Sequence, residues 1–449
     1  MTAKKFISSL IGLAMLASFV ALPAFAESGL QNADEELTDG TFTYELINGT
    51  YTITKCETNA IFETIPELRN GYSVTAIADY ALANCSMISK LEIPDTITSI
   101  GDSAFAGCTS LKEVKLSNRI DKISNGLFMG CSLLEEIDIP DSVKTIESYA
   151  FYNCSALKEV ELPKNLIEIK PMAFAECSYI ENINSDNTAG FVFEDGILYN
   201  SAKTNIYRAS TKLTGDIYIE NTVESVEPGA FSVCAGIENL FLPSSVTTIG
   251  EDAFGYCVSL KKIDFAEGLT GLTSIAPIAF KYCTSLQSVE LPTTLDEIGD
   301  GAFFSCSELS RVIIPEGVRI IGEGVFADCP KLMNLSIPKS VESIGDNAYG
   351  YTTGDNGSYH LDKAVEMSVY SDSEGLKYAK SNGINYSTVD KNLSGMAFIV
   401  IGIGAAIVIV VFAVVLMARA NKGAPVSAKK AKKIAEEKAK DDDYKNIID

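Results

Sequence analysis

The sequence predicts a repeat solenoid, in which short coils stack on one another and share a parallel β-sheet. Ten of the eleven cysteines recur along the chain, most of them at intervals of 23 residues. Phenylalanine keeps the same step three residues before each cysteine, with Leu82 and Tyr349 as the end members. A fixed period of this length is typical of stacked structural repeats.

One unit of the repeat, from Leu134 to Cys154, has the pattern L-x-x-I-x-I-P-x-x-V-x-x-I-x-x-x-A-F-x-x-C. The opening L-x-x-I-x-I is the strand motif of a leucine-rich repeat. We expect Ile137 and Ile139 to point inward and the residues between them to point outward, because strand side chains alternate. Pro140 ends the strand, and a short helical or 3-10 turn returns Ala-Phe and Cys to the core. Such a unit cannot bury its apolar face alone, so about eleven coils must stack into one domain.

At the N-terminus, residues 1–26 predict a secretory signal peptide. Two lysines precede an apolar run from Phe6 to Leu22, and Ala24-Phe25-Ala26 is a small-x-small end suited to signal peptidase. Residues 27–75 predict a β cap, because the segment 42–53 alternates around Asn48-Gly49 as a hairpin does. A cap covers the strand edge that a solenoid would otherwise expose.

The repeats occupy residues 76–360, with two departures from the period. Three extra residues between Cys257 and Cys283 predict a turn insertion at 267–271. A longer insertion at about 182–216 contains two strand-like runs around Asp195-Gly196, which predicts a β-hairpin outgrowth.

The C-terminal cap is expected at residues 361–390. Residues 373–380 predict a short helix that ends near Asn382-Gly383, and a last strand follows through Tyr386.

After a juxtamembrane linker at 391–395, residues 396–418 are apolar and uncharged. At about 1.5 Å per residue, this segment can span the roughly 30 Å of bilayer hydrocarbon as a helix. Residues 419–449 begin with a cluster of basic residues and end in an acidic stretch. The positive-inside rule places this tail in the cytoplasm and the repeats outside, which is a single-pass type I topology.

The formal net charge of −23 argues against binding to nucleic acid or to anionic lipid through the repeats. An acidic surface favours cationic partners or a divalent cation, and the simpler alternative is that it serves solubility.

Ten cysteines in register could suggest disulfides or a metal ladder in an exported protein. Neighbouring coils are about 4.8 Å apart with parallel Cβ vectors, whereas a disulfide needs Cβ atoms about 3.8 Å apart that face each other. We therefore expect a buried ladder of free thiols. His360 is the only histidine and lies in a polar Gly-Ser-Tyr-His segment that favours a surface position. The sequence singles out no catalytic residue, cofactor or metal ligand, although a pair of carboxylates could act as acid and base.

Outward strand positions are where repeat proteins usually bind partners. Early coils present an acidic column, and later coils place apolar Phe241 and Ile313 on the same face. Exposed apolar groups mark contact sites, although scattered exposure of ordinary residues is the alternative. The candidate contact residues are Glu113, Glu136, Asp138, Glu159, Glu161, Phe241, Arg311 and Ile313.

The A-F-x-x-C signature at this step resembles the BspA-type leucine-rich repeats of bacterial surface proteins. The resemblance extends over about residues 42–386 and includes E-D-G-I-L-Y-N at 194–200 and Y-A-K-S-N-G-I at 378–384. It implies a curved right-handed solenoid that adheres to host or microbial partners, without enzyme activity. A membrane helix here replaces the wall-binding or sorting modules that many relatives carry.

These observations predict a surface-anchored binding protein, an adhesin or receptor-like module, of a Gram-positive-type bacterium. Its partner would be an extracellular protein or glycan. The alternatives are a structural component that binds the cell's own wall and an accessory to an enzyme that degrades extracellular polymers.

Overall fold

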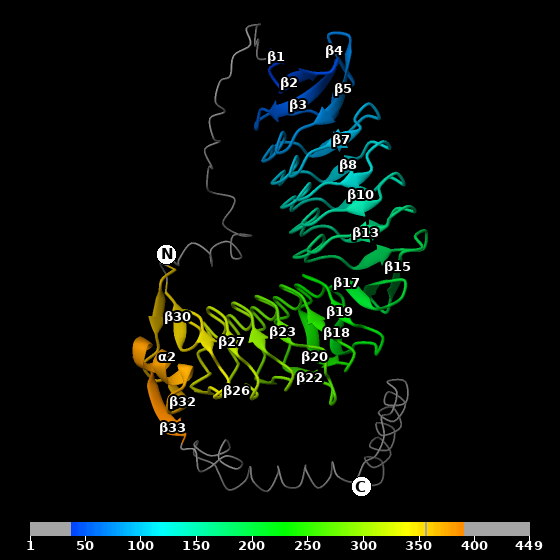
Figure 1. Ribbon diagram of the computed structural model, residues 1–449. Coiled ribbons are helices and arrows are strands. Elements are labelled where there is room, and N and C mark those ends of the chain that lie inside the picture. Colours follow the sequence, from blue (N-terminus) through cyan, green and yellow to red (C-terminus); the bar gives the residue numbers. More distant parts are fainter. Residues whose placement is uncertain (1–36, 355–356, 390–449) are drawn as a thin grey trace, which may run out of the picture. The chain divides into compact units, whose positions relative to one another are not determined.

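The computed structural model describes residues 37–354 and 357–389, which form two compact units with a boundary between Ser201 and Ala202 (Figure 1). Within these residues, no helix combines the length and the apolar composition that a membrane span requires. The predicted signal peptide at 1–26, the linker at 391–395, the membrane helix at 396–418 and the tail at 419–449 lie outside the described residues.

The first unit begins with the expected cap hairpin. Strand β2 (Phe42–Ile47) pairs antiparallel with β3 (Thr50–Cys56), and Asn48 and Gly49 both have positive φ, as a two-residue hairpin turn requires. β3 pairs in parallel with β5, so the cap continues into the repeats. The remaining cap strands are β1 (Leu37–Thr38), β4 (Leu68–Arg69) and β5 (Tyr72–Ile77).

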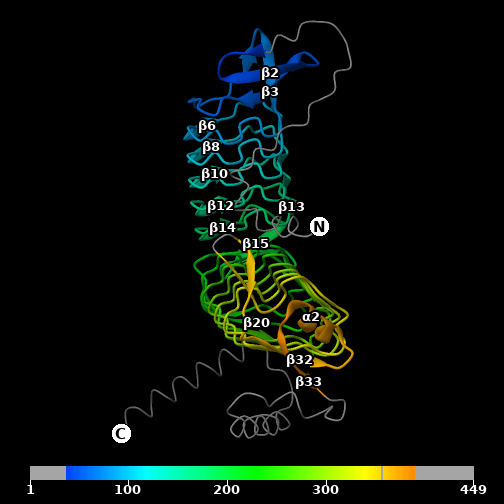
Figure 2. The same cartoon turned by 90° about the vertical axis from the view of Figure 1, so that its left-hand side faces the viewer.

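The repeats of the first unit place two sets of parallel strands on different sides of the stack. Figure 2 shows the longer set as a column along one side, with β13 on the other side. The longer strands are β6 (Lys90–Glu92), β8 (Glu113–Lys115), β10 (Glu136–Asp138), β12 (Glu159–Glu161) and β14 (Asn182–Asn184). The two-residue strands are β7 (Ser99–Ile100), β9 (Lys122–Ile123), β11 (Thr145–Ile146) and β13 (Glu168–Ile169).

The register of these strands confirms the 23-residue period. Glu136 pairs with Glu113, and Ile146 pairs with Ile123, so equivalent residues of successive coils lie side by side. The first unit ends in β15 (Phe191–Glu194) and β16 (Ile197–Asn200), which form the antiparallel hairpin predicted around Asp195-Gly196. Both turn residues have positive φ.

The second unit repeats the two sets of parallel strands. β17 pairs with β19, and β18 pairs with β20, so residues 205–218 already belong to these sets. The longer strands are β18 (Thr214–Tyr218), β20 (Gly236–Leu242), β22 (Lys262–Phe265), β24 (Ser288–Glu290), β26 (Arg311–Ile313) and β28 (Asn334–Ser336). The other set comprises β17 (Asn205–Ala209), β19 (Ser225–Val226), β21 (Thr248–Ile249), β23 (Ser274–Ile275), β25 (Glu297–Ile298), β27 (Ile320–Ile321) and β29 (Ser343–Ile344). The extra residues around Gly268 form the expected turn between β22 and β23.

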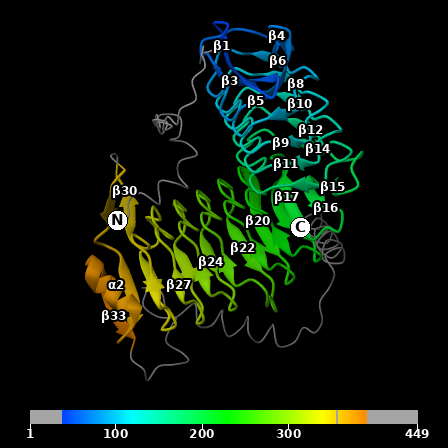
Figure 3. The same cartoon turned by 45° about the horizontal axis from the view of Figure 1, so that its top comes forward.

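A cap with one helix ends the second unit (Figure 3). Ser373 begins α2 (Glu374–Asn382), and its hydroxyl accepts a hydrogen bond from the Leu376 amide at 3.2 Å. Gly383, with φ of 70°, ends the helix, which packs against β32 and β33. The predicted helix and last strand are therefore confirmed. The cap strands are β30 (Tyr351–Thr353), β31 (Tyr359–Leu361), β32 (Glu366–Tyr370) and β33 (Asn385–Val389).

The A-F-x-x-C segments form hydrogen-bonded turns without continuing into helices. In one coil, the amide of Cys131 donates to the Phe128 carbonyl at 3.0 Å, which closes a four-residue β-turn. The residue before every ladder cysteine has positive φ, from Asn84 to Asp328. This conformation interrupts a helix and turns the amide toward the next coil, as the Gly130 amide shows by donating to the Tyr152 carbonyl at 2.8 Å.

Two inward ladders fill the core of each unit. Phe128 stacks between Phe105 and Phe151, with ring centroids 5.6 and 5.7 Å apart, and all three rings are fully buried. Phe254 stacks likewise between Phe231 and Phe280 in the second unit, at 5.0 and 5.2 Å. All eleven cysteines are buried free thiols, and ten of them form the ladder that the sequence predicts. These ladders hold the strands rigid, so the outward side chains project from a fixed support.

Candidate functional site

The outward positions of the longer strands form the candidate surface, and they arise from strand alternation. In β8, Val114 is buried between exposed Glu113 and Lys115, and β10 and β12 repeat this order. A parallel register then aligns equivalent outward residues of successive coils. The surface is therefore a set of side-chain rows on a rigid sheet.

In the first coils, opposite charges on this surface pair across neighbouring strands. The Lys90 ammonium lies 2.9 Å from the Glu113 carboxylate, and the Lys115 ammonium lies 2.6 Å from that of Glu92. Each contact raises the pKa of the lysine, because the hydrogen-bonded carboxylate favours its charged form. Glu113, predicted as a contact residue, is thus already occupied by Lys90.

The next two coils carry what we term the acidic column, Glu136, Asp138, Glu159 and Glu161. All four side chains are exposed. Among the described residues, none of them forms an ion pair, and Glu161 accepts a hydrogen bond from the Asn187 amide group at 3.1 Å. No group of three or more His, Cys, Asp or Glu in the described ranges could hold a metal ion. The column therefore presents a row of negative charges, but it does not place three or more such residues around one point where a metal ion could bind.

In the second unit, Phe241 on β20 belongs to an aromatic pair. Its ring stacks on Tyr218 of β18, with centroids 4.3 Å apart and planes 5° from parallel. The Lys262 ammonium lies 5.9 Å from the centre of the Phe241 ring. Phe241 is consequently half-buried, and the expectation that it is exposed is wrong; 58% of Tyr218 is exposed instead.

Polar contacts flank this aromatic pair. The Asn239 amide group donates to Asp216 at 2.6 Å, and the Lys262 ammonium contacts Asp264 at 2.8 Å. The pair is thus an apolar patch with a polar rim, which is a common arrangement at protein contact sites.

The structure does not bring Phe241 and Ile313 together. They lie on β20 and β26, and β22 and β24 separate these strands in the sheet. Arg311 is exposed, whereas Ile313 is half-buried beside Glu290, its register partner. Phe241 and Ile313 therefore lie on strands that two others separate, and they do not form one patch.

Sequence reasoning missed Tyr218 because Gly215 shifts the pattern. The register between β18 and β20 slips by one residue between Gly215 and Asp216, and Gly215 has positive φ. Leu213 therefore stands four residues before Ile217, where the repeat motif has three. The I-x-I spacing of Ile217 and Ile219 was the remaining signal, because it predicts that Tyr218 points outward.

The ladder thiols after Cys85 have low reactivity. Cys131 donates to the Phe105 carbonyl at 3.2 Å, and Cys154 donates to that of Phe128 at 3.1 Å. Burial raises the pKa of Cys108 to about 12 and that of Cys234 to about 11. The thiolate is the reactive form of cysteine, and a raised pKa keeps these thiols protonated. Their role is therefore packing and hydrogen bonding between coils.

His360 lies on β31 with an exposed side chain. Its Nε2 atom is 3.0 Å from the Ser358 hydroxyl. A Ser-His pair that catalyses acyl transfer needs a further group that orients the imidazole. Ser358 is the side chain with which the imidazole makes a hydrogen bond in the described part of the chain.

A family model matches most of the repeat region. The model of the BspA type leucine-rich repeat region matches in six copies over residues 75–205, 200–274 and 269–357. The chain belongs to this family. The BspA-type assignment agrees with the parallel coils and the inward Phe and Cys ladders, and proteins of this type are typically found on the cell surface.

Solved structures give the same architecture. A leucine-rich cell surface protein from Faecalibacterium prausnitzii A2-165 is 27% identical to this chain and superposes with a TM-score of 0.52. The match covers 72% of this chain and 96% of the Faecalibacterium chain. A leucine-rich repeat protein from Eubacterium ventriosum ATCC 27560 is 23% identical, covers 71% of this chain and 97% of its own, and has a TM-score of 0.51, which supports the fold alone. No curated protein matches the sequence.

Proposed function

We propose that this BspA-type protein is a membrane-anchored binding protein of the bacterial cell surface. It presents the outward sheet of its repeats to an extracellular protein or glycan and catalyses no reaction. The Tyr218–Phe241 pair is the observation that carries this proposal. A large aromatic side chain that remains 58% exposed on a rigid strand loses little conformational entropy when a partner covers it.

Anchoring rests on the apolar segment 396–418 and the basic residues after it. A chain that ends at residue 390 should be secreted into the medium, whereas the full-length chain should stay with the membrane fraction. Release of both forms would contradict the anchor.

The binding test uses the soluble segment 27–390 on an array of matrix proteins, glycans and bacterial wall fragments. Replacing Tyr218 and Phe241 by alanine should weaken a saturable hit at least tenfold, because loss of a central aromatic contact costs about 2 kcal/mol or more. Tyr179→Ala is the matched control, since that tyrosine is also 58% exposed but follows Cys177 in a turn. Equal binding by the double variant and the control would refute the aromatic pair as the contact.

The acidic column supports a second candidate surface, for a basic partner. Reversing the charge of Glu136 and Glu159 to lysine should abolish such binding, whereas reversal of exposed Glu45 in the cap should not. Unchanged binding after the double reversal would exclude the column.

The array also separates the alternatives. Binding only to wall fragments of the producing cell would favour a structural role in the envelope. Turnover of a glycan or peptide by the same segment would favour an enzyme accessory.

A further inference from the structure

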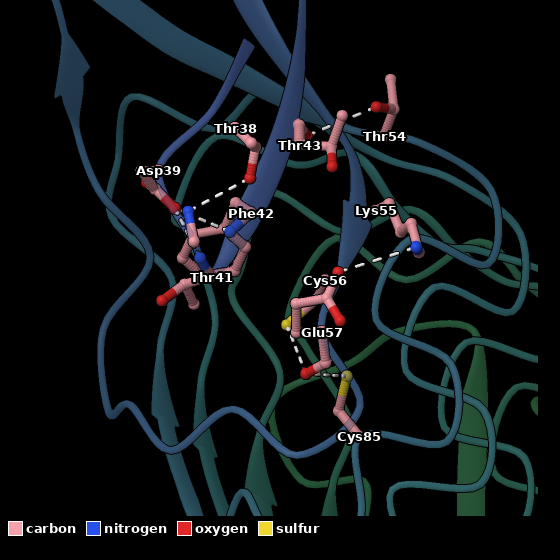
Figure 4. Close-up of polar contacts among 11 residues, drawn as sticks. Thr38, Asp39, Thr41, Phe42, Thr43, Thr54, Lys55, Cys56, Glu57 and Cys85 are labelled. Carbon is pink, nitrogen blue, oxygen red and sulfur yellow. Dashed lines mark hydrogen bonds and ion pairs between the residues drawn. The ribbon is translucent and has the colours of Figure 1, made fainter. Parts of the chain in front are cut away.

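Cys56 stands outside the thiol ladder and differs from it in geometry. It ends β3 of the cap hairpin, 29 residues before Cys85, whereas the ladder step is 23. The Sγ atom of Cys56 lies 3.4 Å from the Glu57 carbonyl oxygen, and the Sγ atom of Cys85 lies 3.8 Å from the same oxygen. Figure 4 shows both sulfurs beside this oxygen.

The ladder thiols after Cys85 avoid this arrangement because each has its own acceptor. Cys131 and Cys154, for example, donate to two different phenylalanine carbonyls in two different coils. At the cap, one acceptor serves two thiols, which confines both sulfur atoms to the same small volume. Both side chains are almost fully buried, so no water layer separates them from the protein.

The direction of approach also differs. Successive ladder cysteines occupy equivalent positions, and their Cβ vectors run parallel, which opposes a disulfide. Cys56 ends β3, three residues after Ile53, whereas Cys85 lies in a turn eight residues after Ile77, the register partner of Ile53, so the two positions are not equivalent. The parallel arrangement that separates the ladder thiols therefore does not apply to this pair.

The two thiols influence each other's ionisation. A hydrogen bond with Cys56 lowers the pKa of Cys85 against the opposing effect of burial, and the same contact raises the pKa of Cys56. Cys85 is thus the member of the pair that ionises more readily, and the thiolate is the form that attacks a disulfide.

We propose that Cys56 and Cys85 form a disulfide that fastens the cap hairpin to the first coil. The oxidant is an external disulfide of the thiol–disulfide exchange class. The Cys85 thiolate attacks one sulfur of this disulfide and expels a thiolate, and the Cys56 thiolate then attacks Cys85 Sγ and expels the second. The pair loses two protons and two electrons, and the external disulfide is reduced to two thiols.

Because both thiols are buried in the folded chain, the exchange needs a state in which they are exposed. An external disulfide reaches Cys85 while the chain folds or when the terminal hairpin opens, because elements at the end of a stack open more easily than its middle. The bond closes the loop between β3 and the first coil and thereby opposes such opening. The outer side of a membrane favours the oxidised form.

The test counts thiols in the full-length chain after equilibration with glutathione at a series of oxidised-to-reduced ratios. The protein is alkylated in denaturant and weighed by mass spectrometry. We expect two of the eleven thiols to disappear as the ratio rises. Trypsin should then yield peptides 56–69 and 70–90 joined by a bond that dithiothreitol breaks, because Lys55, Arg69 and Lys90 bound these peptides.

Two variants control this measurement. Cys108→Ser, which changes the neighbouring ladder thiol, should still lose two thiols, whereas Cys56→Ser should keep all ten. Eleven free thiols in the wild-type chain at every ratio would overturn the proposal. So would linked peptides that join Cys85 to Cys108, and the wild-type peptide map gives this answer even if a variant folds poorly.

Discussion

The two units share an interior and differ on their outward sheets. Both stack phenylalanine rings at 5.0 to 5.7 Å and align buried thiols beside them. Outside, the first unit presents paired charges followed by the acidic column, whereas the second presents the Tyr218–Phe241 pair with a polar rim. Because the ladders occupy inward positions only, the outward positions can change without loss of the fold. Mutations can therefore test the shared interior and the differing outward surfaces of the two units separately.

The thiol ladders of both units should make the protein sensitive to alkali, and we expect this effect to be the largest. Burial raises the pKa of Cys108 and Cys234 from an ordinary 9.0 to about 12 and about 11. A thiol whose pKa is raised by folding contributes its full stabilisation to the folded state below pH 9, where the thiol is protonated in both the folded and the unfolded chain. This stabilisation is lost as the pH rises toward 11 to 12, because the unfolded chain then releases thiol protons that the folded chain retains.

The measurement is the urea midpoint, followed by circular dichroism as the pH rises. Cys234→Ser should flatten the decline relative to the wild type, which separates the thiol contribution from that of tyrosine and lysine. Parallel curves for the two proteins would contradict the prediction.

Truncating one ring of each phenylalanine ladder should cost nearly the same in both units. Phe128→Ala and Phe254→Ala each remove a fully buried ring stacked on two others, which typically costs about 3–5 kcal/mol in the free energy of unfolding. Urea denaturation measures both, and Leu133→Ala, at a side chain that is 44% exposed, is the control with a cost of about 0.5 kcal/mol or less. A large cost in one unit alone would show that the interiors are not equivalent.

Neutralising the acidic column should produce the smallest effect, and only in the first unit. Glu136→Gln with Glu159→Gln removes like charges from neighbouring coils, so the stability at low salt should rise by about 0.5 kcal/mol. The gain should shrink in about 1 M salt, where charges are screened beyond roughly 3 Å. Glu113→Gln is the contrast, because that carboxylate contacts Lys90 and its loss should bring no gain. A gain that persists at high salt would point to packing.

Much of the fold follows from short-range signals. Asn48-Gly49 and Asp195-Gly196 specify their hairpins through positive φ, and Ser373 with Gly383 delimit the helix. The period of 23 specifies which residues of neighbouring coils pair. These features depend on a few adjacent residues or on repetition, so the sequence is sufficient to predict them.

The candidate site was less accessible to this reasoning. Charge signs and outward positions were predicted for the acidic column, but the contact between Lys90 and Glu113 depends on the length and direction of two side chains. Phe241 was identified, whereas its stacking partner Tyr218 was hidden by the bulge at Gly215.

By itself, the sequence determined the repeat, its period and the alternation of inward and outward side chains, because stacked coils repeat one local pattern. Only the tertiary structure decided that Tyr218 covers Phe241 and that Cys56 and Cys85 share the Glu57 carbonyl. The first contact lies just after the register slip at Gly215, and the second joins residues that are 29 apart, outside the period of 23. At such places the distance between two side chains depends on how the backbone bends in space, which repetition does not specify.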